Sequence, residues 1–343
     1  MIEPIGRGES DRPRPYYHTA ILNRVAPIAT AFLLILPPVV RAAPTVIVVV
    51  GAEGTPEYGQ QFMAWAGRWQ TAARRAEASF AVIGQNTAAQ KSDHDQLLAR
   101  LETEPKEGID ELWLVLIGHG TYDDRTVRFN LRGPDVEETE LVRVLASFRR
   151  PVIVVNCFAC SGALLRRLSG PGRVVITATR SGREREFSRF GDYFSQAIMD
   201  PTADYDKDGQ TSLLEAYLAA SRRVAEFYRS DSRLATEHAL LDDNGDALGT
   251  PADWFRGIQA VKKASDGASH DGYRAHQFVL VRSDLDRRIT PELLARRGEL
   301  EISVAELREK KNSLPEDEYF TQLEKILLEL ARIQEQVDQL PRP

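Results

Sequence analysis

The chain has 343 residues, of which 43% are hydrophobic and 27% charged, and its formal net charge is −6. This composition is typical of a globular protein, and the length suffices for one large or two modest domains. An acidic balance without a basic stripe argues against nucleic acid as a partner.

An apolar segment near the amino terminus predicts an export signal. Residues 25–40 carry no charge, follow a polar lead that ends at Arg24, and precede the sequence V-R-A-A-P. Val40 and Ala42 fit the −3 and −1 places of a signal-peptidase site, so residues 1–43 are predicted to be a signal peptide, cleaved after Ala42. A run of about 16 residues interrupted by prolines is short for a membrane span, although an uncleaved anchor remains the alternative. We expect an exported protein, periplasmic or secreted, with no stable membrane span in the mature chain.

Short apolar runs alternate with helical segments along the mature chain. Helices are expected at residues 58–77, 93–101, 163–168, 187–199, 213–228 and 254–264. Strands are expected at residues 45–50, 80–83, 112–117, 152–155, 173–177 and 277–281, with a small hairpin at 126–131. Strand and helix in alternation predict an α/β domain over residues 44–283 with a doubly wound, mostly parallel sheet.

Two of these strands run directly into chemically reactive residues. Residues 112–117 lead into Gly118-His119-Gly120, and residues 152–155 lead into the sequence N-C-F-A-C-S-G, which contains Cys157 and Cys160. The carboxyl ends of parallel strands are where open α/β sheets place their chemistry. A thiol requires a base or a cation nearby to be nucleophilic, and histidine is the usual partner. The sequence therefore predicts that the sheet brings the imidazole and a thiol together.

The motifs at these strand ends resemble those of the caspase-like cysteine peptidases, which include caspases, legumains, metacaspases and gingipains. The resemblance rests on a strand followed by His119-Gly120 and on Ala159-Cys160-Ser161-Gly162, which is similar to the A-C-x-G core of caspases. Legumains and metacaspases have Cys-x-Ser-Gly, whereas this chain has Ala159 in the Cys place. Either the loop is one residue longer here or the nucleophile has been lost.

The resemblance implies a cysteine endopeptidase that acts on a protein or peptide substrate. Cys160 would attack the scissile carbonyl, with Cys157 as the alternative nucleophile, and His119 would serve as general acid and base. The backbone N–H groups of Cys160 and Gly120 would hold the oxyanion. Two other functions remain open, namely a catalytically inactive caspase-like scaffold and a thiol–disulfide protein that uses the C-x-x-C spacing of Cys157 and Cys160.

A polar loop, residues 180–189, follows the predicted strand 173–177. By resemblance it would border the pocket for the substrate residue before the scissile bond. Its charges, residues 183–186, are more simply interpreted as a solvated run.

The sequence D-Y-D-K-D-G-Q-T-S-L-L-E, residues 204–215, matches the EF-hand calcium loop. Oxygen ligands fall at positions 1, 3, 5, 7, 9 and 12, with Gly209 at the sharp turn of position 6. The predicted Ca²⁺ ligands are Asp204, Asp206, Asp208, Gln210 through its carbonyl, Ser212 and Glu215. Many bacterial caspase-like proteins resemble this chain in carrying such a loop. The competing interpretation is an acidic turn that binds nothing.

A weaker copy of this loop occupies residues 242–253. Asp242, Asn244, Asp246, Thr250 and Asp253 stand at positions 1, 3, 5, 9 and 12, but Ala247 replaces the glycine of position 6. The spacing suits a second EF-hand loop, whereas the missing glycine favours a plain Asp-Asn-Gly turn. The nearby His238 has no ligand partners at useful spacing and is expected to be structural.

Beyond Asp284 the composition changes to charge-rich helix, so residues 284–343 are predicted to form a helical tail. The apolar residues of its second half step by three and four positions, at Leu323, Ile326, Leu330, Ile333, Val337 and Leu340. This spacing is a heptad seam. It predicts either an antiparallel helical hairpin or a coiled coil with a helical partner.

Overall fold

The computed structural model of the protein describes residues 43–86, 90–267 and 269–340. Their centre is a seven-stranded sheet in which five adjacent strands are parallel and the last two are antiparallel additions at one edge. From edge to edge the strands are β10 (Thr250–Pro251), β9 (Leu240–Asp242), β8 (Arg173–Thr177), β7 (Val152–Cys157), β3 (Leu112–Ile117), β1 (Thr45–Val50) and β2 (Ser79–Ile83). The predicted mostly parallel α/β sheet is thus confirmed.

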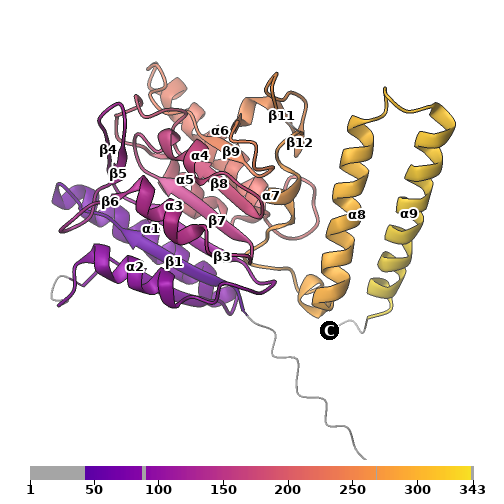
Figure 1. The fold of residues 1–343 in the computed structure, drawn as a ribbon, viewed down its shortest axis with the longest axis horizontal. Coiled ribbons are helices and arrows are strands. Elements are labelled where there is room, and N and C mark those ends of the chain that lie inside the picture. The colour runs from indigo at the N-terminus through magenta and orange to yellow at the C-terminus, as the bar shows by residue number, and fades with distance from the viewer. Residues whose placement is uncertain (1–42, 87–89, 268, 341–343) are drawn as a thin grey trace, which may run out of the picture. The chain divides into compact units, whose positions relative to one another are not determined.

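Helices cover both faces of this sheet (Figure 1). One face packs against α1 (Pro56–Arg75), α5 (Phe190–Ala197) and α6 (Leu213–Ser230), and the other against α2 (Asp93–Thr103), α3 (Glu138–Leu145) and α4 (Gly162–Leu168). Every residue of β1, β3 and β7 is buried because both faces are covered. This explains why these strands appear in the sequence as continuous apolar runs.

The α1 side of the core contains the largest buried side chains. Trp69 lies between Trp113 of β3 and Phe194 of α5, with ring centroids 6.1 and 5.9 Å away. Each such side chain removed from water contributes about 1.5–3 kcal/mol. Helices α1 and α5 are therefore fixed on the central strands whose ends carry His119 and the cysteines.

A small antiparallel sheet follows His119. It consists of β4 (Gly120–Tyr122), β5 (Val127–Phe129) and β6 (Val136–Glu137), so the predicted hairpin exists and has a third strand. Val127 and Phe129 are buried and join the core on the α2 side. This arrangement holds the His119 loop against the main sheet.

Two predictions for residues 254–281 are wrong. The expected helix 254–264 is instead a 3-10 turn, η2 (Ala252–Trp254), and a hairpin of β11 (Phe255–Arg256) and β12 (Gln259–Ala260) that turns at Gly257 with φ +57°. The expected strand 277–281 is instead the last residue of α7 (Tyr273–Gln277) and an irregular segment that bends at residues 280–281. The segment is apolar because Leu280 packs into the core. The Phe278 carbonyl accepts the backbone N–H of Leu213, the first residue of α6.

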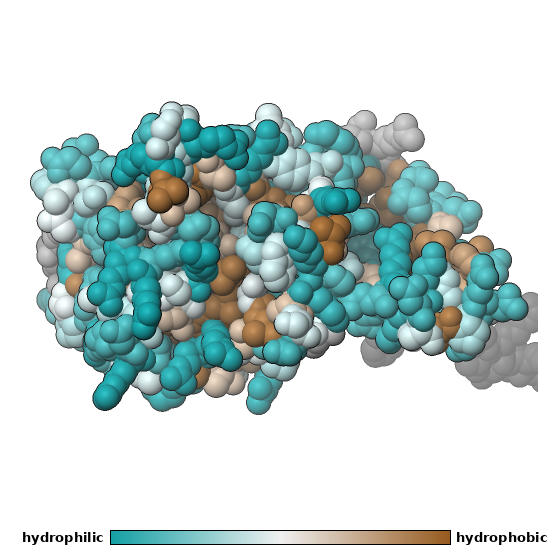
Figure 2. Space-filling view, turned by 90° about the horizontal axis from the view of Figure 1, so that it is seen from above, coloured by the Kyte–Doolittle hydropathy of each residue, from teal (hydrophilic) through white to brown (hydrophobic). Residues whose placement is uncertain are grey.

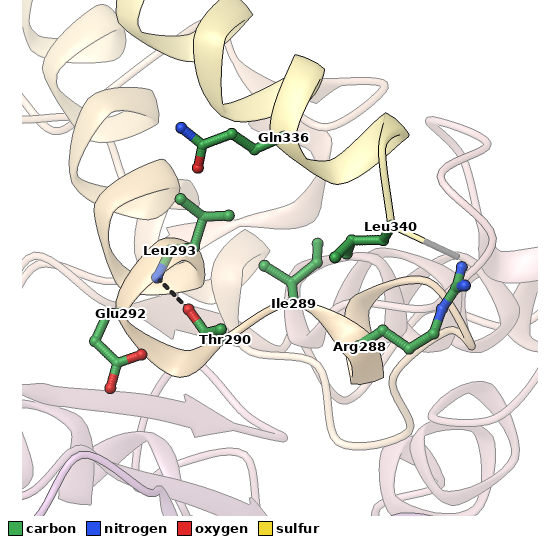
Figure 3. A pocket seen from close by; sticks show the side chains of 7 residues that line it. All are labelled: Arg288, Ile289, Thr290, Glu292, Leu293, Gln336 and Leu340. Carbon is green, nitrogen blue, oxygen red and sulfur yellow. Dashed lines mark hydrogen bonds between the residues drawn. The ribbon is translucent and has the colours of Figure 1, made fainter. Parts of the chain in front are cut away.

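The tail contains two helices, α8 (Pro291–Glu309) and α9 (Glu316–Asp338), which run antiparallel as a hairpin (Figure 1). The predicted seam of α9, apart from Leu323, packs onto α8, and Leu300 of α8 and Ile333 and Val337 of α9 are buried in this contact. A pocket of about 370 Å³ lies between the start of α8 and the end of α9, bounded by residues such as Leu293 and Leu340 (Figure 3).

Polar contacts tie this hairpin to the preceding residues. Gln277 of α7 donates to the Gly298 carbonyl, and Arg297 pairs with Asp286 of η3 (Asp286–Arg288) at 2.9 Å. Hydrophilic side chains cover most of the face seen in Figure 2. Among the described residues, no helix is both long and apolar enough to cross a bilayer. The predicted signal peptide lies almost wholly outside the described residues, and the domain boundaries at 43 and 283 remain predictions.

Candidate active site and calcium loop

The His119 loop and the cysteine loop lie side by side at the end of the sheet. Strands β3 and β7 are neighbours, with Ile117 paired to Cys157 at their last positions. Gly120 touches the second loop so closely that a Cβ there would lie 2.3 Å from the Phe158 ring and 2.6 Å from the Ala159 carbonyl oxygen. Only glycine fits at that position, so the two loops are packed together without space between them.

The His119 imidazole lies in a group of aromatic rings. Its centroid is 5.0 Å from that of Tyr58, 5.2 Å from Phe62 and 6.1 Å from Phe187. Its Nε2 atom is 3.2 Å from the carbonyl oxygen of Glu53. Because a carbonyl only accepts, this contact assigns the proton of the neutral ring to Nε2 and leaves Nδ1 as the acceptor. The histidine therefore has one nitrogen available as a base.

The Cys160 thiol is buried on the other side of the sheet end. Only 1% of this residue is exposed, and it belongs to the apolar cluster of α2, α3 and α4 that contains Phe129 and Phe158. Burial raises the pKa of the Cys160 thiol, and the charge of Arg185 offsets the effect only in part. Its backbone has φ +65°, and its N–H donates to the Glu184 carbonyl at 2.8 Å. The amide suggested for an oxyanion hole is therefore already bonded.

Cys157 is equally buried, but in the cluster on the α1 face, with Trp65 and Phe190. Helix α5 lies directly over it, since a Cβ at Gly191 would be 2.6 Å from the Cys157 Cβ. Burial raises the pKa of the Cys157 thiol strongly, and the charge of Glu237 raises it further. Both cysteines are free thiols, and they belong to clusters on opposite faces of the sheet.

The aromatic residues around His119 belong to the α1 face, on which Cys157 also lies, whereas Cys160 joins the opposite cluster. Among the described residues, no hydrogen bond links His119 to either thiol. The sheet thus brings the two loops together without pairing imidazole and thiol. A reactive cysteine needs partial exposure and a positive environment, and neither thiol has both.

Glu184 stabilises the loop that holds the Cys160 amide. Its carboxylate accepts the Arg180 N–H at 2.9 Å and both the backbone N–H and the Nδ1 of His238, the latter at 2.6 Å. The neighbouring Arg183 and Arg185 are exposed, as expected for a solvated charge run. Glu184 differs from them because it is mostly buried. Sequence spacing gave no signal for this contact, since its two partners are 54 positions apart.

A cavity of about 640 Å³ borders the aromatic group. Tyr58 and Phe187 line it and also surround His119, while Arg189, Arg233 and Glu57 supply charges. The Arg189 guanidinium lies 4.0 Å from the Phe227 ring centroid. Aromatic walls with a few charged groups suit an extended peptide or a polar side chain.

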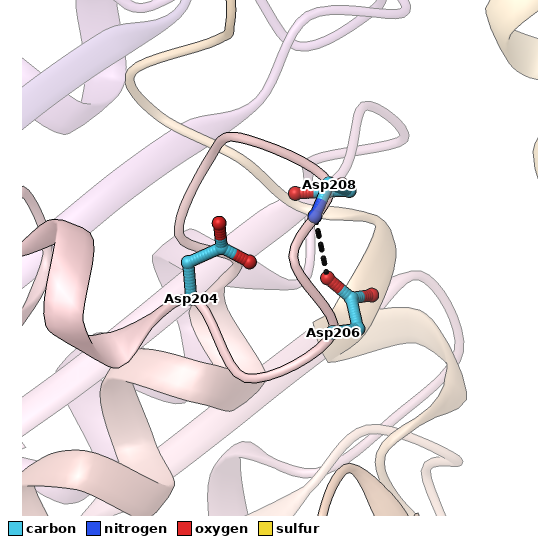
Figure 4. A group of neighbouring side chains, drawn as sticks. All are labelled: Asp204, Asp206 and Asp208. Carbon is cyan, nitrogen blue, oxygen red and sulfur yellow. Dashed lines mark hydrogen bonds between the residues drawn. The ribbon is translucent and has the colours of Figure 1, made fainter.

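The acidic loop 204–215 gathers its carboxylates. Oxygen atoms of Asp204, Asp206 and Asp208 lie within 4.8 Å of one another, and the three side chains converge on the loop (Figure 4). The loop follows α5 and the short η1 (Pro201–Ala203) and leads into α6, so the two predicted flanking helices are present. Burial, the largest cause, raises the pKa of Asp206 and of Asp208, and neighbouring carboxylates raise both further. The repulsion between these groups is what a bound cation would relieve.

Glu215 closes this loop from the first turn of α6. Its Oε1 accepts the N–H of Tyr205 at 2.7 Å and of Asp206 at 3.3 Å, and its Oε2 accepts the Ser212 hydroxyl at 2.8 Å. Gly209 has φ +88°, the left-handed turn expected at position 6. These residues fit a hard divalent cation, because carboxylate and carbonyl oxygens are the donors that Ca²⁺ prefers.

The sequence matches no protein-family model and no curated protein. Two similar solved structures are caspases, the family that the strand-end motifs resemble. The Drosophila initiator caspase Dronc has 15% identity and a TM-score of 0.41, over 60% of this chain and 81% of that one. Caspase-1 from Spodoptera frugiperda has 9% identity and a TM-score of 0.37, over 59% and 86%.

Proposed function

We propose that this chain is an exported, calcium-binding, catalytically inactive caspase-like protein that binds a peptide or protein segment. The burial of its thiols carries the proposal. The whole chain has two cysteines, both 1% exposed, and burial raises the pKa of each. Without an accessible thiolate, peptide-bond attack has no sulfur nucleophile.

The strand-end region comprises the His119 loop (residues 118–120) and the cysteine loop (residues 157–162). The cavity lined by Tyr58 and Phe187 supports peptide binding as the remaining role of this region. It is open to solvent, and three aromatic side chains (Tyr58, Phe187 and Tyr228) and several charged ones line it. His119 contacts the first two of these rings and contributes a hydrogen-bond acceptor. A segment bound there would contact apolar walls and pair with charged groups without being cleaved.

A cysteine endopeptidase is the second candidate, because the His119 loop touches the loop that carries Cys160. Activation would require the Cys160 thiol to leave its apolar cluster. The bond between the Cys160 N–H and the Glu184 carbonyl would have to break, and Glu184 is itself held by His238. Loop 180–189 would be the segment that moves.

An electrophilic peptide probe distinguishes the two candidates. We expect no labelling of Cys160 or Cys157 in the native protein, with or without millimolar calcium, and full labelling of both in denaturant. Peptide turnover that Cys160→Ala abolishes and Cys157→Ala retains would establish the endopeptidase instead. The variant Cys157→Ala also serves as the matched control, since it removes a thiol of equal burial.

Calcium at loop 204–215 would be held by the side chains of Asp204, Asp206, Asp208 and Glu215 and by the Gln210 carbonyl, with Ser212 at position 9. Bound there, it would neutralise carboxylates that otherwise repel one another. A single extracellular-type loop binds with a dissociation constant on the order of 0.1–1 mM. This range of affinity suits an exported protein.

Export itself is tested by mass analysis of the mature chain, whose first residue is expected to be Ala43.

A further inference from the structure

The second acidic loop repeats the backbone hydrogen bonds of the first. In the first loop the side chains at positions 1, 3 and 5 accept the N–H groups of Lys207, Asp208 and Gln210. In the second loop Asp242, Asn244 and Asp246 accept the equivalent N–H groups, those of Gly245, Asp246 and Leu248, at 2.8–2.9 Å. The backbones match as well, with positive φ at positions 4 and 6 of both loops. Ala247 takes φ +66° where the first loop has glycine.

Asp271 occupies the place that Glu215 has in the first loop. It accepts the N–H groups of positions 2 and 3, Asp243 and Asn244, at 3.0 and 3.3 Å. It also accepts the hydroxyl of position 9, Thr250, at 2.6 Å, as Glu215 accepts that of Ser212. The carboxylate that closes the second loop is therefore that of Asp271, two residues before α7, and not that of Asp253, the residue at position 12.

An incompletely paired buried carboxylate is an independent sign of a ligand. Asp242 has no exposed surface, and its Oδ2 accepts no hydrogen bond of normal geometry among the described residues. Burial raises the pKa of the Asp242 carboxyl, and the nearby Ser169 hydroxyl offsets this rise in part. Its Oδ1 accepts the Gly245 N–H, so the carboxylate points into the loop. In the described part of the chain, Asp242, Asp243 and Asp271 are all buried and form no ion pair with Lys, Arg or His. Buried carboxylates are costly to ionise without a counter-ion, and a bound cation would supply one.

We propose that residues 242–250 and Asp271 form a second calcium site. Its ligands are the side chains of Asp242, Asn244 and Asp246, the Leu248 carbonyl at position 7, and Asp271 as the closing carboxylate. The amide at position 3 leaves two carboxylates among the ligands at positions 1, 3 and 5, where the first loop has three. Fewer charged ligands weaken Ca²⁺ binding, so the second site should be the weaker of the two.

Native mass spectrometry of the full mature chain, stripped with chelator and then titrated with Ca²⁺, tests the assignment. We expect two ions per chain for the wild type and one for Asp206→Asn/Asp208→Asn, whose remaining ion occupies the second site. Asp271→Asn should also bind one ion, and the combination of all three substitutions none. Asp253→Asn is the matched control and should keep two ions, because this exposed residue lies outside the proposed ligand set.

The outcomes separate this site from the first one. A wild type that binds a single ion, lost in Asp206→Asn/Asp208→Asn, would overturn the second site, as would two ions in Asp271→Asn. A single ion lost only in Asp271→Asn would support the second site and reject the first. Loss of an ion in Asp253→Asn would overturn the closing role of Asp271. Asp246→Asn, at a less buried position, should lose the same ion as Asp271→Asn. The melting temperature of each variant shows whether it is folded.

Discussion

The strand-end region and the acidic loop 204–215 are both recognisable in the sequence, but the structure treats them differently. Strand neighbours bring the His119 and cysteine loops into contact, yet the two thiols belong to apolar clusters on opposite faces. The acidic loop instead directs three carboxylates toward one another within five positions of chain. A motif contained in one turn fixes its own geometry. A motif assembled from two strands depends on the packing around it.

The contrast between the two regions would fail most clearly if the two thiols were alkylated as fast as exposed cysteines are. Because Cys157 and Cys160 are each 1% exposed, and burial also raises the pKa of both thiols, we expect native alkylation at least about a thousandfold slower than in denaturant, equivalent to about 4 kcal/mol of protection. Raised pKa values also mean that the rate should keep rising with pH beyond 9. A plateau near pH 7 for Cys160, measured by mass spectrometry, would indicate a reactive thiolate and contradict the inactive assignment.

The strand-end region should also tolerate substitution poorly. A Cβ at Gly162 would lie 2.2 Å from the Ser181 N and 2.5 Å from the Thr179 carbonyl oxygen, and backbone atoms cannot rotate away. We expect Gly162→Ala to lower the free energy of unfolding by about 3 kcal/mol. Gly170→Ala is the control, since no atom beyond its two chain neighbours lies within 4 Å of its Cβ position. Equal urea midpoints for the two variants would show that this loop is loosely packed.

Calcium should stabilise the protein by a smaller amount. At ten times the dissociation constant, one site contributes about 1.4 kcal/mol, or a few degrees in melting temperature. Glu215→Gln should remove most of the shift attributable to the first site, because position 12 supplies the bidentate carboxylate. Glu226→Gln, an exposed substitution on the same helix, should leave the shift intact. A melting temperature that is identical in chelator and in calcium would rule out both sites.

The smallest effects come from exchanging the position-6 residues of the two acidic loops. Gly209 has φ +88° and Ala247 has φ +66°, both in the left-handed region. We expect Gly209→Ala to destabilise by about 1 kcal/mol and Ala247→Gly to stabilise by a similar or smaller amount. Thermal melts in chelator measure both. Stabilisation by Gly209→Ala would mean that the two loops do not share a backbone conformation.

Local sequence determined much of this protein. The five parallel strands and helices α1, α2 and α4 appear as predicted, because apolar runs bounded by turn residues have few other ways to be buried, whereas α3 was not predicted. The convergence of Asp204, Asp206 and Asp208 was predictable for the same reason, since neighbouring backbone N–H groups fix the loop. The strand predicted at residues 277–281 was wrong, because burial against α6 gives this segment the same apolar pattern as a buried strand.

Only the tertiary structure decided which groups meet across distant segments. Cys157 and Cys160 are three positions apart, and the change of backbone direction at the end of β7, with Cys160 at φ +65°, sends them into different clusters. Asp271 closes the second loop from 29 positions beyond Asp242, where no spacing rule would place it. Side chains brought together by packing leave no periodic trace in the chain. The sequence therefore specified the α/β sheet and the first acidic loop. Tertiary packing decided the burial of the thiols and the carboxylate that closes the second acidic loop.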